Sequence, residues 1–137
     1  MEIKQSIEIS QSPVNIWNYL LLVSTDAEWR TDYSKTEWTS QPPYGVGSTG
    51  THHHKKMGAI PWTIIKWEEG RHMEWIMGES MFKDSIGYYH IEPENEGSRV
   101  TICSKMELPL FMRIIMAFLG KKVVKADLKR LKAIMEK

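Results

Sequence analysis

The sequence predicts an α+β domain in which a curved antiparallel sheet of about seven strands wraps around one long C-terminal helix. Between Tyr33 and Glu107, strand-like segments alternate with short turn sequences. Such short links fit antiparallel neighbours, because parallel neighbours need crossovers of about a dozen residues. From Leu110 to Lys137 there is no proline, and the second half carries its apolar residues on one helical face. Only this helix is long enough to cover one face of the sheet.

One strand and two short helices are expected before the main part of the sheet. Apolar and polar residues alternate from Glu2 to Ser10, which predicts a half-buried first strand. Ser12 and Pro13 are typical of a helix N-cap and first helical residue, so a short helix is expected to follow them. A second short helix is expected over Ser24–Arg30. Both helices need packing to be stable at this length.

Six further strands complete the expected sheet, separated by turn sequences rich in glycine, proline and asparagine. They are Tyr33–Ser40, Gly47–Lys56, Ala59–Glu68, His72–Glu79, Phe82–Glu92 and Ser98–Glu107. The sequence contains no internal repeat, low-complexity tract or linker, so residues 1–137 are expected to form a single domain.

Composition narrows the classes of function. The net charge of +1 does not favour nucleic acid as a partner. The one cysteine, Cys103, excludes an internal disulfide framework and is compatible with a reducing compartment. The chain begins directly on a strand pattern, and charges interrupt the apolar part of the last helix well short of about 18 residues. A cytoplasmic location is therefore expected, and a membrane-spanning helix is not.

Several short stretches are similar to the START-like (SRPBCC) superfamily. They are Ile7-Glu8-Ile9, Ser12-Pro13-Val14-Asn15-Ile16-Trp17, Trp29, Gly45-Val46-Gly47, Trp67-Glu68-Glu69-Gly70-Arg71, Ile91-Glu92-Pro93, Gly97-Ser98-Arg99-Val100-Thr101 and Leu128-Lys129-Arg130-Leu131-Lys132. The similarity runs from Ile3 to Glu136. It implies the helix-grip fold shared by birch-pollen-allergen-type and polyketide cyclase/dehydrase-like proteins. Members of this superfamily bind lipids, hormones or polyketides, and some are enzymes.

A hydrophobic ligand site is expected between the sheet and the last helix. Six tryptophans and nine methionines are available to line it, and small residues on the helix leave space. The expected ligand is a lipid, a polyketide-like molecule or an isoprenoid. A closed core is the alternative interpretation of the same apolar residues. The candidate ligand-binding residues are Trp29, Trp67, Met73, Trp75, Met77, Tyr89, Ala117, Gly120 and Val124.

An enzyme of the polyketide cyclase/dehydrase type is the main alternative. Asp84, Tyr88 and His90 would share one face of a strand and could form an acid–base set. No nucleophile elbow or phosphate-binding loop is present, so the sequence favours binding over catalysis, and no cofactor is expected.

A metal role for the histidine run is less favoured. His52 and His54 would share a strand face, but two imidazoles make an incomplete zinc site. A position at the edge of the cavity or on the surface is the simpler expectation.

The first half of the last helix is apolar on nearly every side. Phe111, Ile114, Ile115 and Phe118 project on the face that becomes lysine-rich after Lys121. Such a surface must be covered or used as a contact. Three roles for this surface remain possible from the sequence: it is covered by the Pro42–Gly45 loop, it forms a homodimer contact, or it is a membrane-facing gate to the cavity. The last would suit a lipid chaperone resembling coenzyme-Q-binding START-like proteins.

Overall fold

The order of helices and strands follows the sequence-based expectation in this computed structural model, which describes residues 1–137. A single 3₁₀ turn, η1, leads into the second short helix. The elements are β1 (Glu2–Ile9), α1 (Pro13–Leu21), η1 (Val23–Thr25), α2 (Asp26–Trp29), β2 (Tyr33–Trp38), β3 (Thr49–His54), β4 (Gly58–Glu68), β5 (His72–Met77), β6 (Ile86–Glu94), β7 (Gly97–Lys105) and α3 (Leu110–Met135).

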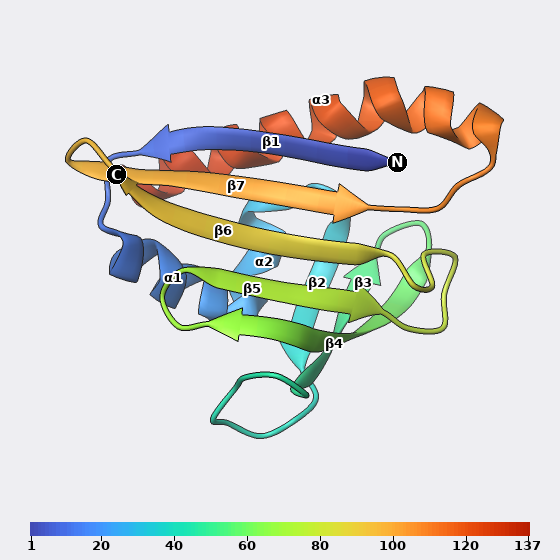
Figure 1. Ribbon diagram of the computed structural model, residues 1–137, viewed down its shortest axis with the longest axis horizontal. Helices are drawn as coiled ribbons and strands as arrows, with labels where there is room; N and C mark the ends of the chain where they lie inside the picture. The colour runs from blue at the N-terminus through green and yellow to red at the C-terminus, as the bar shows by residue number, and fades with distance from the viewer.

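All seven strands form one antiparallel sheet in the order β1-β7-β6-β5-β4-β3-β2. Strands β2 to β7 are a meander, in which each strand pairs with the next along the chain. The first strand, β1, pairs with the last, β7. Figure 1 shows the resulting sheet with β1 and β7 beside α3, and β2 and β3 at the other edge.

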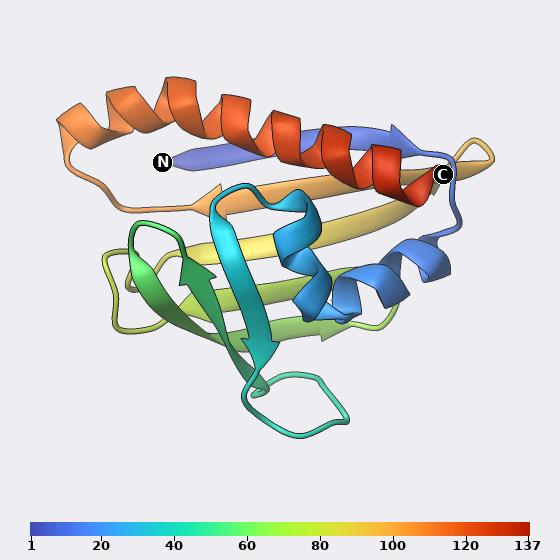
Figure 2. The same ribbon diagram turned by 180° about the vertical axis from the view of Figure 1, so that it is seen from behind.

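The helices lie on the concave side of this sheet. Figure 2 shows α3 running along β1 and β7, with α1 and α2 on the same side. Val124, Leu128 and Leu131 on α3 are buried against the sheet, whereas the lysines of this half are largely exposed. At the start of α1, the Ser12 side chain accepts a hydrogen bond from the Asn15 N–H, as the N-cap prediction required. The predicted helix-grip arrangement is confirmed.

Two strands differ locally from the sequence-based prediction. The strand predicted from Phe82 begins at Ile86, because residues 82–85 form a turn in which Asp84 has a φ of 67°. In β4 the register shifts between Ile64 and Lys66, which indicates a β-bulge. A bulge adds one residue to one strand and changes which side chains face inward. Strict alternation would put Ile65 on the same inward face as Trp67. Because of the bulge, Ile64 is the buried residue instead.

The first half of α3 remains uncovered. Phe118 is 70 % exposed and Phe111 66 % exposed, with Ile114 and Ile115 also exposed. The loop between β2 and β3, which contains Pro42–Gly45, lies at the bottom of Figure 1, far from the start of α3, so the possibility that it covers this surface does not hold. The loop instead stacks Tyr44 on Trp38 with ring centroids 3.9 Å apart. No helix is long and apolar enough to cross a bilayer.

Candidate ligand-binding site

A cavity of about 450 Å³ lies between the concave face of the sheet and α3. Fourteen of its 23 lining residues are hydrophobic. Most of them come from the central strands β4 to β7 and from the middle of α3, because the sheet curls around the helix. The main apolar contributors are Ile3, Ile60, Trp75, Met77, Ile86, Ile102, Met106, Met116, Val123 and Val124.

The predicted ligand-binding residues separate into three groups. Trp75, Met77, Gly120 and Val124 line the cavity. Met73 and Tyr89, together with Trp75, line a much smaller chamber of about 20 Å³ deeper in the core. Neither space is lined by the remaining three, Trp29, Trp67 and Ala117. Trp29 packs beside Tyr89 with centroids 5.9 Å apart, and Trp67 packs edge-on against Trp17 at 5.1 Å.

Gly120 was expected to leave open space in the cavity. In the structure it instead allows α3 to approach the sheet closely. A Cβ at this position would lie 2.5 Å from the Cδ1 of Ile3 on β1. The absence of a side chain therefore brings the helix against β1. A large residue here would displace α3 as well as fill the cavity.

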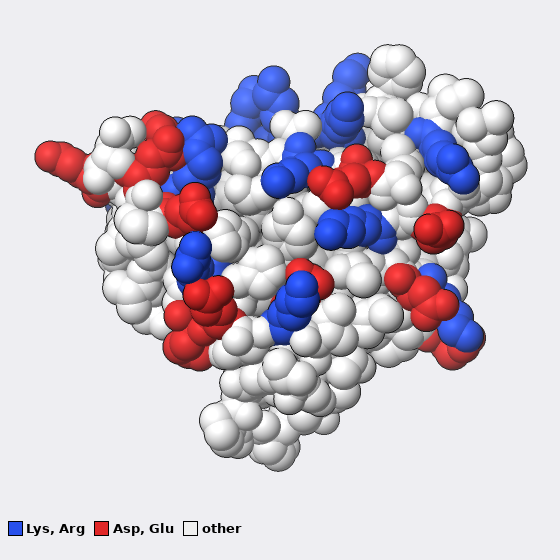
Figure 3. Space-filling model, in the orientation of Figure 1, with Lys and Arg blue, Asp and Glu red and all other residues white.

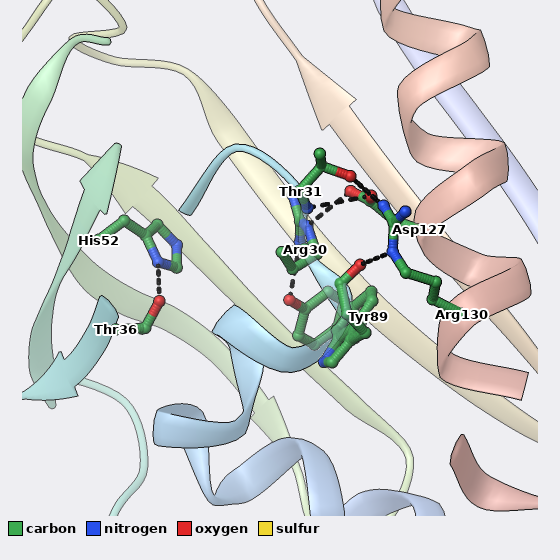
Figure 4. A network of polar contacts seen from close by, with 8 residues as sticks. Arg30, Thr31, Thr36, His52, Tyr89, Asp127 and Arg130 are labelled. Carbon is green, nitrogen blue, oxygen red and sulfur yellow. Dashed lines mark hydrogen bonds and ion pairs between the residues drawn. The ribbon is translucent and has the colours of Figure 1, made fainter. Parts of the chain in front are cut away.

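A buried polar network ties α3 to the segment that follows α2 (Figure 4). Asp127 is 2 % exposed and accepts hydrogen bonds from the Thr31 amide at 3.2 Å and the Thr31 hydroxyl at 2.7 Å. Arg130 donates to the same carboxylate at 2.6 Å, and the Arg30 Nε lies 3.4 Å from it. Arg30 also donates to the Tyr89 hydroxyl at 2.9 Å. The Asp127 charge is thus fully compensated inside the protein.

The small chamber contains a second buried carboxyl group, that of Asp26. Asp26 is 1 % exposed, and its Oδ1 has no hydrogen-bond partner in the protein. Burial raises the pKa of Asp26 to about 7, although the Arg30 charge and the Thr36 hydroxyl lower it in part. An unpartnered carboxyl oxygen in an apolar core is costly, so the neutral acid is favoured up to this pH.

The two candidate metal ligands have other partners. His52 is buried, its Nδ1 lies 3.0 Å from the Thr36 hydroxyl, and its ring stacks on Tyr33 at 4.4 Å. Burial, followed by the Arg30 charge, lowers the pKa of His52 well below its usual range, so the imidazole is neutral near pH 7. The Nδ1 of His54 accepts hydrogen bonds from the backbone N–H groups of Lys56 and Met57. No group of three or more potential ligands is positioned to hold a metal ion.

The candidate acid–base residues do not meet at the cavity. Asp84 is exposed in the turn before β6, so the prediction that it shares a strand face with Tyr88 and His90 is wrong. By strand alternation, Tyr88 and His90 point away from the face that carries Tyr89. His90 lies against His72 instead, with their Nδ1 atoms 2.9 Å apart. Neither Tyr88 nor His90 lines the cavity or the chamber.

His54 lines the cavity, in agreement with one of the two positions expected for the histidine run, but sequence reasoning missed the other main polar residues of the site. Arg30, Tyr33 and Asp127 all line the cavity, yet none was a candidate. Asp127 did carry a signal, because it interrupts the apolar stripe between Val124 and Leu131. A charged residue on the buried face of a helix needs a partner and therefore marks a polar site. Arg30 and Tyr33 offered no comparable pattern.

Comparisons with known proteins agree with this architecture. Residues 1–136 match the model of the family described as "Polyketide cyclase / dehydrase and lipid transport". A START superfamily protein from Mycobacterium smegmatis superposes with a TM-score of 0.80 at 12% identity, over 98% of this chain and 97% of that one. The protein TTHA0849 from Thermus thermophilus gives 0.76 at 18% identity, over 97% and 95% of the two chains.

A further similar structure is that of the Aha1 dimer from Colwellia psychrerythraea, with a TM-score of 0.70 at 18% identity, over 99% of this chain and 96% of that one. The search of curated proteins gave no match. Identities this low establish the fold alone, whereas the family model covers nearly the whole sequence. The chain belongs to the polyketide cyclase/dehydrase and lipid transport family.

Proposed function

We propose that this protein binds a hydrophobic small molecule in the cavity between its sheet and α3. The observation that carries the proposal is the cavity itself, about 450 Å³ in volume and lined mainly by aliphatic, methionine and tryptophan side chains. Pockets for small molecules have volumes of roughly 300 to 1,000 Å³. Burial of apolar ligand surface would contribute about 25 cal/mol per Å², less the cost of association.

Filling the cavity should weaken binding without unfolding the protein. Val123 on α3 is half-buried and lines the cavity, so Val123→Phe places a phenyl ring where the ligand would lie. The affinity for the neutral dye Nile red, measured by fluorescence titration, should fall at least about tenfold, or about 1.4 kcal/mol. Val46→Phe is the matched control, because Val46 is exposed in a loop remote from the cavity.

Ser104→Phe on β7 fills the same space from the sheet side. It tests whether the effect of Val123→Phe comes from filling the cavity or from a local change in α3. Circular dichroism and thermal melting establish that each variant is folded. Unchanged dye affinity in both folded variants would show that the cavity is not the binding site.

Exchange of the ligand with an anionic lipid bilayer is a second candidate function. The uncovered residues of α3, here called the apolar patch (Leu110, Phe111, Ile114, Ile115, Phe118 and Leu119), continue directly into the cavity, because Leu119 also lines it. Lys121, Lys122 and Lys125 are exposed just beyond the patch. Figure 3 shows a largely uncharged surface at the end of the molecule where α3 begins.

The combination of an apolar patch with neighbouring lysines fits the interface of a bilayer that contains anionic lipids. A second copy of the chain fits less well, because two apposed patches would bring like-charged lysines together. The patch would then place the cavity entrance against the membrane, so that a ligand enters without crossing water.

Lysine substitutions in the apolar patch should abolish vesicle binding. We expect the native protein to sediment with vesicles of phosphatidylcholine containing about one third phosphatidylglycerol, and the Ile115→Lys/Phe118→Lys variant to stay in solution. Val46→Lys, at an exposed apolar position elsewhere, should bind like the native protein. Native protein that ignores vesicles would contradict this second function. If it sediments as a dimer that the double substitution dissociates, the patch is a contact between copies.

A further inference from the structure

One wall of the cavity is polar, in contrast to the apolar wall built by the central strands and α3. This polar wall consists of Arg30 after α2, Tyr33 at the start of β2, and His54 and Lys56 at the end of β3. These side chains come from segments that adjoin one another, because β2 and β3 are paired. The polar groups of a mainly apolar pocket fix the orientation of its ligand.

Tyr33 presents a hydroxyl that has no partner in the protein, although its ring is held firmly. The ring stacks on His52 at 4.4 Å with an interplanar angle of 5°, and the Arg30 guanidinium lies 4.9 Å from its centroid. Burial raises the pKa of Tyr33, so the hydroxyl keeps its proton and remains a hydrogen-bond donor. A rigid, unpaired donor at a cavity wall is suited to an acceptor on a ligand.

His54 is fixed as a second donor by its own backbone contacts. Its Nδ1 accepts hydrogen bonds from the Lys56 N–H at 3.1 Å and the Met57 N–H at 3.2 Å. In the neutral ring the proton must then lie on Nε2, which has no partner in the protein. The ring lies between Tyr33 and Phe82, at centroid distances of 6.0 and 6.4 Å, and both of these residues line the cavity.

Arg30 and Lys56 add positive charge to the same wall. Two nitrogens of the Arg30 guanidinium are engaged, by Asp127 and by the Tyr89 hydroxyl, and the second terminal nitrogen has no partner. The exposed Lys56 lies at the rim. Two carboxylates also border the cavity: that of Asp127 is already bound by Arg30, Arg130 and Thr31, and that of Asp32 is exposed to solvent.

We infer that the ligand carries a hydrogen-bond-accepting oxygen group, a carboxylate or a carbonyl, which binds Tyr33, His54 and Arg30 while its apolar body fills the rest of the cavity. The inference rests on the proposed function and names the class of molecule that the cavity selects: an amphipathic molecule with an oxygen acceptor at one end. A pure hydrocarbon would leave three donors unpaired, which a site built for an acceptor disfavours.

Three naphthalene derivatives of similar size serve as probe ligands. Comparing them distinguishes the contribution of the oxygen group to affinity from that of the apolar ring. They are 2-naphthoate with a carboxylate, 2-acetylnaphthalene with a neutral carbonyl, and 2-ethylnaphthalene with no acceptor. Tyr33→Phe removes the hydroxyl alone and keeps the ring. It should weaken the binding of 2-naphthoate and 2-acetylnaphthalene about tenfold, as expected for the loss of one hydrogen bond to a strong acceptor, and leave 2-ethylnaphthalene unchanged.

Tyr44→Phe is the matched control, because Tyr44 lies in the loop against Trp38, away from the cavity. Lys56→Met should weaken 2-naphthoate alone, because only that probe is charged. If Tyr33→Phe leaves all three dissociation constants unchanged while 2-ethylnaphthalene still binds, the head-group assignment is wrong and the apolar cavity stands. If native protein binds none of the three, the proposed function itself fails.

Discussion

Replacing Asp26 with asparagine should make the protein more stable above neutral pH and remove much of the pH dependence of its stability between pH 4 and 7. The folded state raises the pKa of this buried carboxyl from 3.8 to about 7. Between these values the folded protein holds a proton that the unfolded chain releases. The free energy of unfolding therefore falls as the pH rises through this range, by up to roughly 4 kcal/mol, and the loss is complete above about pH 7.

The asparagine variant cannot ionise, so its advantage over the native protein should grow from pH 4 to pH 7 and then level off. Urea unfolding at pH 4, 5.5, 7 and 8 measures this difference directly. Asp84→Asn is the matched control, since Asp84 is exposed and asparagine tolerates its left-handed backbone. A carboxyl titration of Asp26, followed by NMR, that inflects near pH 4 would contradict the expectation.

Replacing Asp127 with alanine should be among the most destabilising single substitutions in the chain. The change removes the carboxylate that pairs with Arg30 and the acceptor of the Thr31 hydroxyl, at a position that is itself 2 % exposed. Removal of one member of a buried ion pair costs about 3 to 5 kcal/mol. The expected drop in the free energy of unfolding at pH 7 is of that size, measured by urea unfolding.

Asp127→Asn should lose less stability, because an amide oxygen still accepts from the Thr31 hydroxyl. Lys129→Ala is the control for changes in helix propensity, since Lys129 is exposed on the same helix. A loss below about 1 kcal/mol in Asp127→Ala, in the range of exposed ion pairs, would show that this network does not stabilise the attachment of α3.

The apolar half of the site was partly predictable because period-two alternation decides which side chains of a strand share a face. Trp75 and Met77 line the cavity as this pattern indicates, and Val124 follows from the helical stripe. Trp67 was misplaced. It packs against Trp17 of α1. This contact depends on where α1 lies on the sheet, which strand alternation does not indicate.

The polar half of the site was not predictable in the same way. Asp127 lies far along the chain from Arg30 and Tyr33, and the three show no common pattern, whereas His54 belongs to a histidine run that was expected at the cavity edge or on the surface. They meet because α3 passes beside the segment that follows α2 (Figures 2 and 4) and because β2 is paired with β3. For Asp84 the local pattern was misleading. The sequence pattern predicted a strand at this residue, but it lies in the turn before β6.

The sequence by itself determined the order of the elements, the antiparallel meander and the helix that covers it. These follow from local physics: hydrophobic periodicity, turn residues and caps act over a few residues each. Only the tertiary structure decided how far the sheet curls, how closely Gly120 lets α3 approach β1, and which buried charges find partners. These depend on packing between segments about a hundred residues apart, and no local pattern encodes the volume left between them.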